Sequence, residues 1–250
     1  AYHHIDTDGV YKLDGTTSYT DVMVNRSSGD RTFFHYRGVM DKFTIEHVLT
    51  LNIQAKIAHF AYIPLLKTFL AKDLEYPNQA CRLFDRLRQR GIKIAVDLVS
   101  IPDQELFLHS ITPTLEYIDY LIINDEEAKL LCGITPGHGE RLYEVLANKL
   151  LSKGVNEIVI IHYPNGAAAA TKEMGTLSCA SYWVEHDEIM STLGAGDAFC
   201  AGALYAIHEN MSLENILKYG NACARFNLFS LSSTDGAVAK ETLAAFIANH

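Results

Sequence analysis

The chain has 250 residues, of which 48% are hydrophobic and 20% charged, as in a globular protein with a large core. Its 21 basic and 30 acidic side chains give a net charge of −9, so no surface for a nucleic-acid backbone is expected. The longest apolar runs, such as 158–161 and 167–170, are far shorter than the roughly 20 residues of a membrane span. Neither nucleic acid nor a membrane is a predicted partner.

Cysteines and histidines show no spacing typical of a disulfide framework or a metal site. The five cysteines include no CxxC pair, which argues against a zinc ribbon and favours the reducing cytoplasm. The eleven histidines include no HExxH pattern. A transition-metal site is therefore not expected.

The first 38 residues predict a β-hairpin. Residues 19–24 and 31–36 are rich in β-branched and aromatic types, and turn-forming residues lie between them. Both arms mix polar and apolar side chains, so one face either contacts water or closes over a ligand. The aromatic residues of the second arm, which include Phe34 and Tyr36, cover that ligand or form a contact between two copies of the chain.

From residue 41 the sequence alternates between helical and strand patterns. The strands are predicted over 92–96, 121–123, 158–161 and 181–184. The helices are predicted over 80–90, 125–132, 139–152, 197–209, 213–227 and 240–248. Trp183, the only tryptophan, is predicted to lie in the core. This alternation is typical of an α/β fold, a parallel sheet with helices on both faces.

Polar residues follow the predicted strands directly. Asp97, Asn124 and His162 each come after an apolar run. In parallel sheets ligands bind beyond the carboxyl ends of the strands, so these residues are candidates for a site. For Asp97 the alternative is that it caps a turn.

The segment Ser191-Thr-Leu-Gly-Ala-Gly-Asp197 leads into an amphipathic helix. Gly194, Ala195 and Gly196 allow a sharp turn that presents backbone N–H groups at the helix N-terminus, which would form an anion hole. Asp197 follows them, and one interpretation is that it only caps the helix electrostatically. The other is that it takes a proton from a hydroxyl nucleophile while the N–H groups stabilise a phosphoryl group in transfer.

Asn124 and Glu127 form a second candidate pair at a strand end. Their spacing of three at a helix start lets both side chains face one point, as Mg²⁺ or its bound waters would require. The same spacing is also that of a capping box, with Asn124 as N-cap and Glu127 as the third helical residue.

In this order, the hairpin, the Asn-x-x-Glu pair and the Gly-Ala-Gly-Asp segment resemble the ribokinase-like (PfkB) family of carbohydrate and nucleoside kinases. Thr192, Gly194, Ala195, Gly196 and Asp197 match the family's C-terminal signature, and Asn124 with Glu127 matches its Asn-x-x-Glu motif. The resemblance covers essentially the whole chain. It implies a Rossmann-like three-layer α/β/α sandwich with a mostly parallel sheet and a small β-hairpin lid.

The resemblance also implies a function and a set of roles. The function is ATP-dependent phosphorylation of a sugar hydroxyl, with ATP and Mg²⁺ as cofactors. Asp197 would be the catalytic base, residues 194–196 the anion hole, and Asn124 with Glu127 the magnesium-organising pair. The other implied site residues are, for the nucleotide, Thr192, Gly166, Asn221, Ala224 and Gly236, and for the substrate lid, Thr20, Phe34 and Tyr36.

The predicted organisation is a lid over 16–38 and an α/β domain over 1–15 and 39–250. The chain departs from the family's pattern in three places. The family's opening strands, with the Gly-Gly pair that holds the sugar, have no counterpart ahead of Ala1. Only Gly166 remains of the nucleotide motif Thr-x-Gly-x-x-Gly over 161–166, and Ser191 replaces the first acid of the signature. Two alternatives follow: a truncated, non-catalytic nucleotide-binding remnant, and an adenosine-type nucleoside kinase.

Overall fold

The computed structural model describes residues 5–25, 31–52, 54–134 and 141–250. The centre of this part of the chain is a six-stranded sheet whose strands lie in chain order, β3-β4-β5-β6-β7-β8. Strands β3 to β6 are parallel, and β7 and β8 are antiparallel to their neighbours. The bounds are β3 Ile57–Phe60, β4 Lys93–Val96, β5 Tyr120–Asn124, β6 Ile158–Tyr163, β7 Gly166–Thr171 and β8 Gly175–Ala180.

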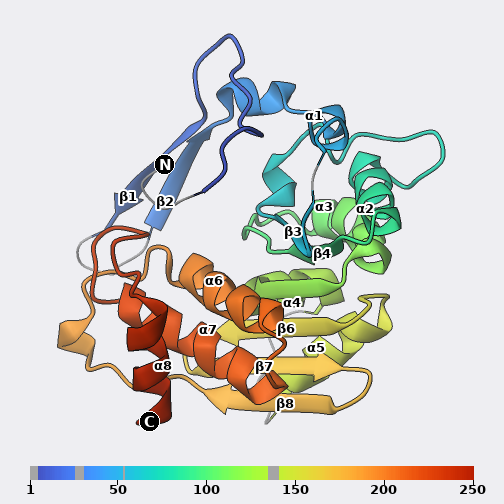
Figure 1. Ribbon diagram of the computed structural model, residues 1–250. Helices are drawn as coiled ribbons and strands as arrows, with labels where there is room; N and C mark the ends of the chain where they lie inside the picture. The colour runs from blue at the N-terminus through green and yellow to red at the C-terminus, as the bar shows by residue number, and fades with distance from the viewer. Residues whose placement is uncertain (1–4, 26–30, 53, 135–140) are drawn as a thin grey trace.

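Helices cover both faces of this sheet (Figure 1). Their bounds are α1 Ile45–Leu49, α2 Gln79–Gln89, α3 Gln104–Leu106, α4 Asp125–Cys132, α5 Leu142–Ser152, α6 Ala195–His208, α7 Leu213–Asn227 and α8 Lys240–Ala248. Short 3₁₀ or π segments lie at Gly38–Lys42, Ile63–Leu65, Phe107–Ile111, Thr112–Tyr117 and His186–Glu188.

Alternation along the strands assigns the core residues to the two faces. On β4, Ile94 and Val96 pack with α2, α4 and α5, while Ala95 between them packs with α6 and α7. Ile122 of β5 and Ile160 of β6 share the second face with Ala95. Successive strand residues point to opposite faces, so these runs are apolar throughout because both faces are covered. The predicted three-layer α/β architecture is confirmed.

The predicted hairpin is confirmed as a separate two-stranded sheet. Strand β1, Tyr19–Val24, pairs antiparallel with β2, Arg31–Tyr36, and Tyr19 lies opposite Tyr36. It projects away from the main sheet in Figure 1. Residues 26–30, which carry the predicted turn, lie outside the described residues, as do 139 and 140 of the helix predicted over 139–152.

Two predictions near the C-terminal half are wrong. Residues 181–184 form no strand; they follow β8 as an irregular segment, because the pairing positions beside β7 are already occupied by β8. Trp183 is 78% exposed, and its indole N–H donates to Glu185, so it does not lie in the core. Its polar N–H lets this ring remain at the surface.

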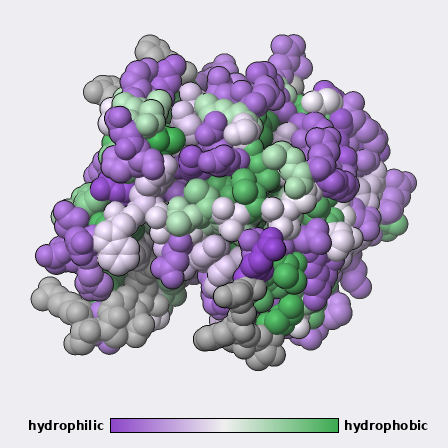
Figure 2. Space-filling view, turned by 90° about the horizontal axis from the view of Figure 1, so that it is seen from below, coloured by the Kyte–Doolittle hydropathy of each residue, from purple (hydrophilic) through white to green (hydrophobic). Residues whose placement is uncertain are grey.

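Polar side chains cover most of the face shown in Figure 2, and apolar side chains gather near its middle. Such a mixed surface is ordinary for a protein in water. Within the described ranges, no helix combines the length and the hydropathy that a bilayer span needs.

Candidate active site

The N-terminus of α6 forms the centre of the site. Gly194 precedes this helix with a φ of +79°, in the left-handed region, and its carbonyl accepts from Ala198 N at 2.8 Å. A side chain at Gly194 would also lie 2.5 Å from the carbonyl oxygen of Ser233. Only glycine therefore fits this turn. Among the first N–H groups of α6, Ala195 N donates to Thr192 O at 3.4 Å and Ala198 N to Gly194 O; N–H groups at a helix start and the helix dipole together give a positive potential there, which favours an anion.

Asp197 lies in the first turn of α6, with an exposed carboxylate. Its Oδ1 accepts a hydrogen bond from the phenol of Tyr62 at 2.5 Å. Burial raises the pKa of Tyr62, and the hydrogen bond to Asp197 raises it further, so the phenol remains a donor. The carboxylate is thus placed to accept a hydrogen bond from a hydroxyl group, and the Tyr62 phenol donates that bond in this structure.

Tyr62 is a residue of the site that the sequence reasoning missed. It follows β3 in the left-handed conformation, with φ +58°, which is uncommon for a residue other than glycine. Its backbone N–H donates to Asp97 Oδ1 at 3.2 Å. Tyr62 therefore connects the two aspartates, Asp97 at the end of β4 and Asp197 on α6. It lies 135 positions from Asp197 in the chain, and no local motif marks it.

Asn124 and Glu127 form the capping box that the sequence offered as one interpretation. Glu127 N donates to Asn124 Oδ1 at 2.9 Å, and Asn124 N donates to Glu127 Oε2 at 3.0 Å. Glu127 Oε1 also accepts from Ser100 Oγ at 3.1 Å and from Asn124 Nδ2 at 2.9 Å. The carboxylate is only 2% exposed, and burial raises its pKa to about 7. The role of the pair in holding magnesium stays a prediction.

Three carboxylates lie close enough to the Tyr62 side chain to affect its pKa. Asp197, Asp97 and Glu127 all raise its pKa through their negative charge. Across the described residues, the ion pairs with Lys or Arg include none of these three; Asp97 faces only a histidine. Oxygen ligands without basic partners are the environment that Mg²⁺ prefers, so the residues present fit a divalent cation.

A cavity of about 390 Å³ lies between α6, α7 and the loop that leads to α8. Asp197 lies at its lining, together with Gly236 from the loop and mostly apolar side chains of the helices. This volume falls in the usual range for small-molecule sites. Of the residues predicted to contact the nucleotide, the structure places Gly236 in this lining.

The other predicted nucleotide residues do not line that cavity. Thr192 is exposed in the turn before α6, where its carbonyl accepts from Ala195 N at 3.4 Å. Asn221 is buried, and its amide donates to Ala180 O at 3.2 Å, joining α7 to β8. Ala224 packs against the core on the α6–α7 face. Their contacts with a nucleotide stay predictions.

Gly166 opens β7, and a side chain there would lie 2.4 Å from Cys179 O. The pairing of β7 with β8 therefore accounts for this glycine without a ligand. His162, in β6 beside it, contacts the first turn of α6 instead. Its ring packs against Phe199, with the ring centroids 4.9 Å apart, and lies 3.2 Å from a Cβ built on Gly196. Burial lowers the pKa of His162 to about 4, so the ring is neutral at pH 7.

The lid residues predicted from the sequence lie on the hairpin. Thr20 Oγ1 is hydrogen bonded to His35 Nδ1 at 2.7 Å across the two strands. Phe34 and Tyr36 are exposed, and the Tyr36 ring lies 5.4 Å from that of Tyr19. A function for these aromatic side chains as a lid or as a dimer contact stays a prediction.

The family model described as "pfkB family carbohydrate kinase" matches residues 1–240. The chain belongs to the pfkB family of carbohydrate kinases. Over 193 residues it is 28% identical to the 2-dehydro-3-deoxygluconokinase of Bacillus subtilis, covering 76% of this chain and 55% of that relative. Over 236 residues it is 26% identical to the 2-dehydro-3-deoxygluconokinase of Escherichia coli, covering 90% of this chain and 73% of that relative.

The fold of this pfkB chain is also that of solved kinases. A Ribokinase II of E. coli in complex with ATP and Mg²⁺ superposes with a TM-score of 0.70 at 20% identity, covering 92% of this chain and 71% of that one. At this identity the likeness shows the fold alone. The predicted family and the predicted ribokinase-like architecture are both confirmed.

Proposed function

We propose that this protein catalyses ATP-dependent phosphorylation of a hydroxyl group on a small carbohydrate, with Asp197 as the base. The observation that carries the proposal is the hydrogen bond from the Tyr62 phenol to Asp197 Oδ1, at the N-terminus of α6. A hydroxyl donor thus contacts the carboxylate directly after residues 194–196, which supports the proposed anion hole beside the base. A base and an anion hole that share one site suit phosphoryl transfer.

Each part of the site contributes a separate task. Asp197 would accept the proton of the attacking hydroxyl, which removes the need for free alkoxide. The N–H groups around residues 194–196 would hold the oxygens of the transferring group. The cavity bounded by Gly236 would hold the base of the nucleotide, because it is apolar and opens toward Asp197. When bound, Mg²⁺ would neutralise phosphate charge, and Asn124 with Glu127 would orient it.

The names of the relatives suggest the substrate. The relatives from B. subtilis and E. coli are both named for 2-dehydro-3-deoxygluconate, an acidic sugar derivative. We therefore propose a sugar of this size and polarity as acceptor, with 2-dehydro-3-deoxygluconate as the first compound to test. A structural neighbour from Burkholderia thailandensis is a nucleoside kinase in complex with inosine, so nucleosides belong in the same panel.

We also propose that residues 16–38 act as the lid. The exposed aromatic side chains on both strands support a cover for the sugar or a contact with a second copy.

The cysteines at all five positions are free thiols, which supports a reducing compartment such as the cytoplasm.

The proposal is tested with the full chain and the Asp197→Asn variant. Loss of a general base lowers the rate by about 10²–10⁴-fold, so ADP release coupled to NADH oxidation should fall by that factor. Binding of ATP, measured by calorimetry, should change little. Asp187→Asn, an exposed acid on a separate segment, is the matched control. If Asp197→Asn retained most of the activity of the wild type, the assignment of the base would be wrong.

A further inference from the structure

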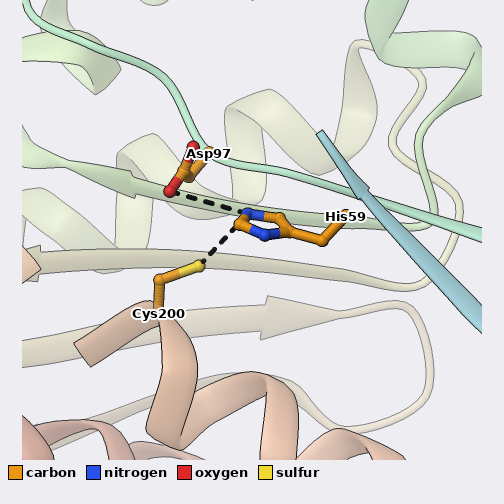
Figure 3. Close-up of side chains that lie close together, drawn as sticks. All are labelled: His59, Asp97 and Cys200. Carbon is orange, nitrogen blue, oxygen red and sulfur yellow. Dashed lines mark hydrogen bonds and ion pairs between the residues drawn. The ribbon is translucent and has the colours of Figure 1, made fainter. Parts of the chain in front are cut away.

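Three side chains from separate elements converge beside the proposed active site. His59 comes from β3, Asp97 from the end of β4 and Cys200 from the second turn of α6, and Figure 3 shows all three pointing toward one point. His59 Nε2 lies 3.6 Å from Asp97 Oδ2 and 3.7 Å from Cys200 Sγ. One ligand atom from each residue lies within 4.8 Å of the other two.

These distances differ from those of a hydrogen-bonded relay. A relay of the Cys-His-Asp type uses both ring nitrogens, one toward the acid and one toward the thiol. Here the acid and the thiol both face Nε2. The Nε2 to Oδ2 distance of 3.6 Å is also too long for a good hydrogen bond. The three atoms therefore surround a shared point rather than forming a chain.

The spacing matches that of ligands around a small cation. With bond lengths of about 2.0–2.3 Å, the ligands of tetrahedral Zn²⁺ lie about 3.3–3.6 Å from one another. The two distances from Nε2 are within a few tenths of an ångström of this range. The third distance, from Cys200 Sγ to an Asp97 carboxylate oxygen, is at most 4.8 Å, and side-chain rotation would have to shorten any excess over this range.

The charge and the burial of the cluster favour a cation too. Asp97 and Cys200 are buried; burial raises the pKa of the Cys200 thiol, and the negative charges of Asp97 and Asp197 raise it further. Asp97 Oδ1 is occupied by the Tyr62 N–H, which leaves Oδ2 directed at the cluster. Apart from His59, no positive partner of Asp97 is found among the ion pairs of residues 5–25, 31–52, 54–134 and 141–250.

We propose that His59, Asp97 and Cys200 form a binding site for one borderline divalent cation of the Zn²⁺ class. A mixed nitrogen, oxygen and sulfur set selects zinc or cobalt over magnesium, which takes oxygen ligands. On binding, the Cys200 thiol proton leaves to solvent and a sulfur–metal bond forms. The His59 side chain is 36% exposed, so a water would complete the fourth position.

This site contains neither Asn124 nor Glu127 but shares Asp97 with the three carboxylates near Tyr62, and its sequence signal is weak because its ligands lie on three elements. It does not depend on the proposed kinase activity. Binding would fasten α6 to the ends of β3 and β4, one turn from Asp197.

The test uses the tag-free full chain, kept reduced and freed of metal with a chelator. Cobalt chloride is titrated under nitrogen, and the sulfur-to-cobalt charge-transfer band in the near ultraviolet is recorded. We expect one equivalent of Co²⁺ to produce this band, Zn²⁺ to abolish it, and millimolar Mg²⁺ to leave it unchanged. Displacement by Mg²⁺ would overturn the proposal, because the site would then be an ordinary oxygen site.

Two variants and a matched control complete the test. Cys200→Ser should lose the band. His59→Gln should weaken Co²⁺ binding by at least about tenfold, because replacing even a residue that only supports a metal ligand weakens metal binding by about that factor. Cys179→Ser, a partly buried cysteine on β8, should keep the band. His59 is the safer variant for folding because its side chain is partly exposed. Unchanged cobalt binding in His59→Gln, or no band in the wild type, would refute the site.

Discussion

The buried carboxylate of Glu127 makes folding stability depend on pH in a way that one substitution removes. Burial raises its pKa from an ordinary 4.5 to about 7 in the folded protein. Below pH 4.5 the carboxyl group is protonated in the folded and unfolded chains alike. As the pH rises toward 7 the unfolded chain releases this proton first, so the folded state loses stability over that window.

The size of the effect follows from the difference in pKa. At 1.36 kcal/mol for each pKa unit, the rise corresponds to about 3 kcal/mol of stability lost between pH 4.5 and 8. Glu127→Gln carries no charge at any of these pH values. The free energy of unfolding of the variant, relative to the wild type, should therefore increase by about 2–3 kcal/mol from pH 5 to pH 8. In a chain of this length that is about 5–10 °C in melting temperature.

The assay is urea unfolding followed by circular dichroism at several pH values. Taking the difference between variant and wild type at each pH cancels the titration of all other groups. Glu126→Gln is the matched control: it lies next to Glu127 on α4, but its side chain is 64% exposed, so it should follow the wild type. Millimolar Mg²⁺ should flatten the pH dependence of the wild type, since a cation beside Glu127 favours the ionised form.

The reasoning has a clear point of failure. If Glu127→Gln and the wild type change in parallel between pH 5 and 8, the carboxylate does not hold its proton in the folded state. The description of Glu127 as a buried group without a positive partner would then be incorrect. The assigned direction of the pKa shift would also be wrong if the stability difference between variant and wild type were independent of pH without Mg²⁺ and became dependent on pH with Mg²⁺.

Three further substitutions test other contacts of the site. Tyr62→Phe removes the phenol hydroxyl that donates a hydrogen bond to Asp197 Oδ1. Because water weakens a hydrogen bond to an exposed carboxylate, this bond is worth about 1 kcal/mol, and its loss should raise kcat/KM for the acceptor about fivefold. A tenfold fall would show that the phenol assists the reaction. Gly194→Ala should lower the melting temperature more than Gly91→Ala. Both glycines have φ near +80°, which costs about 1 kcal/mol for alanine, but only at Gly194 would the new Cβ lie 2.5 Å from a backbone oxygen, that of Ser233. Equal losses of melting temperature would exclude that contact. Ala201→Trp fills the cavity from α6, so calorimetry should show ATP affinity reduced at least tenfold; unchanged affinity would place the nucleotide elsewhere.

The hairpin and three of the four parallel strands, β4, β5 and β6, were predictable because their composition is decisive, whereas the sequence analysis predicts no strand at β3. Two short β-branched and aromatic segments predicted β1 and β2 with the bounds that the structure has. The sequence of β7 indicates only an apolar run, since alanine has little preference for strands. It forms a strand because β6 and β8 pair with it on both sides and leave room only for small side chains between the helices.

The candidate site was predictable only where the chain itself brings its parts together. Gly194 and Asp197 are three residues apart, so a motif could identify them. Tyr62 meets Asp197 only through the fold, and its left-handed conformation is imposed by the turn after β3, where local propensity would disfavour it. Trp183 was misplaced for a related reason: hydrophobicity alone does not tell whether a loop covers a large ring.

The order of the main sheet has a consequence for how the site comes into being. Each strand pairs with the strand just before or after it in the chain, but only β6, β7 and β8 are joined by short turns, whereas crossovers that contain helices join the parallel strands β3 to β6. The helices α6 and α7 follow all six strands in the chain and cover the second face of the sheet. During synthesis that apolar face stays exposed until roughly the last 60 residues emerge from the ribosome. A chaperone would be needed during that interval, because exposed apolar surface is prone to aggregation. The turn before α6 is built in the same step, so we expect anion binding to report the completion of folding.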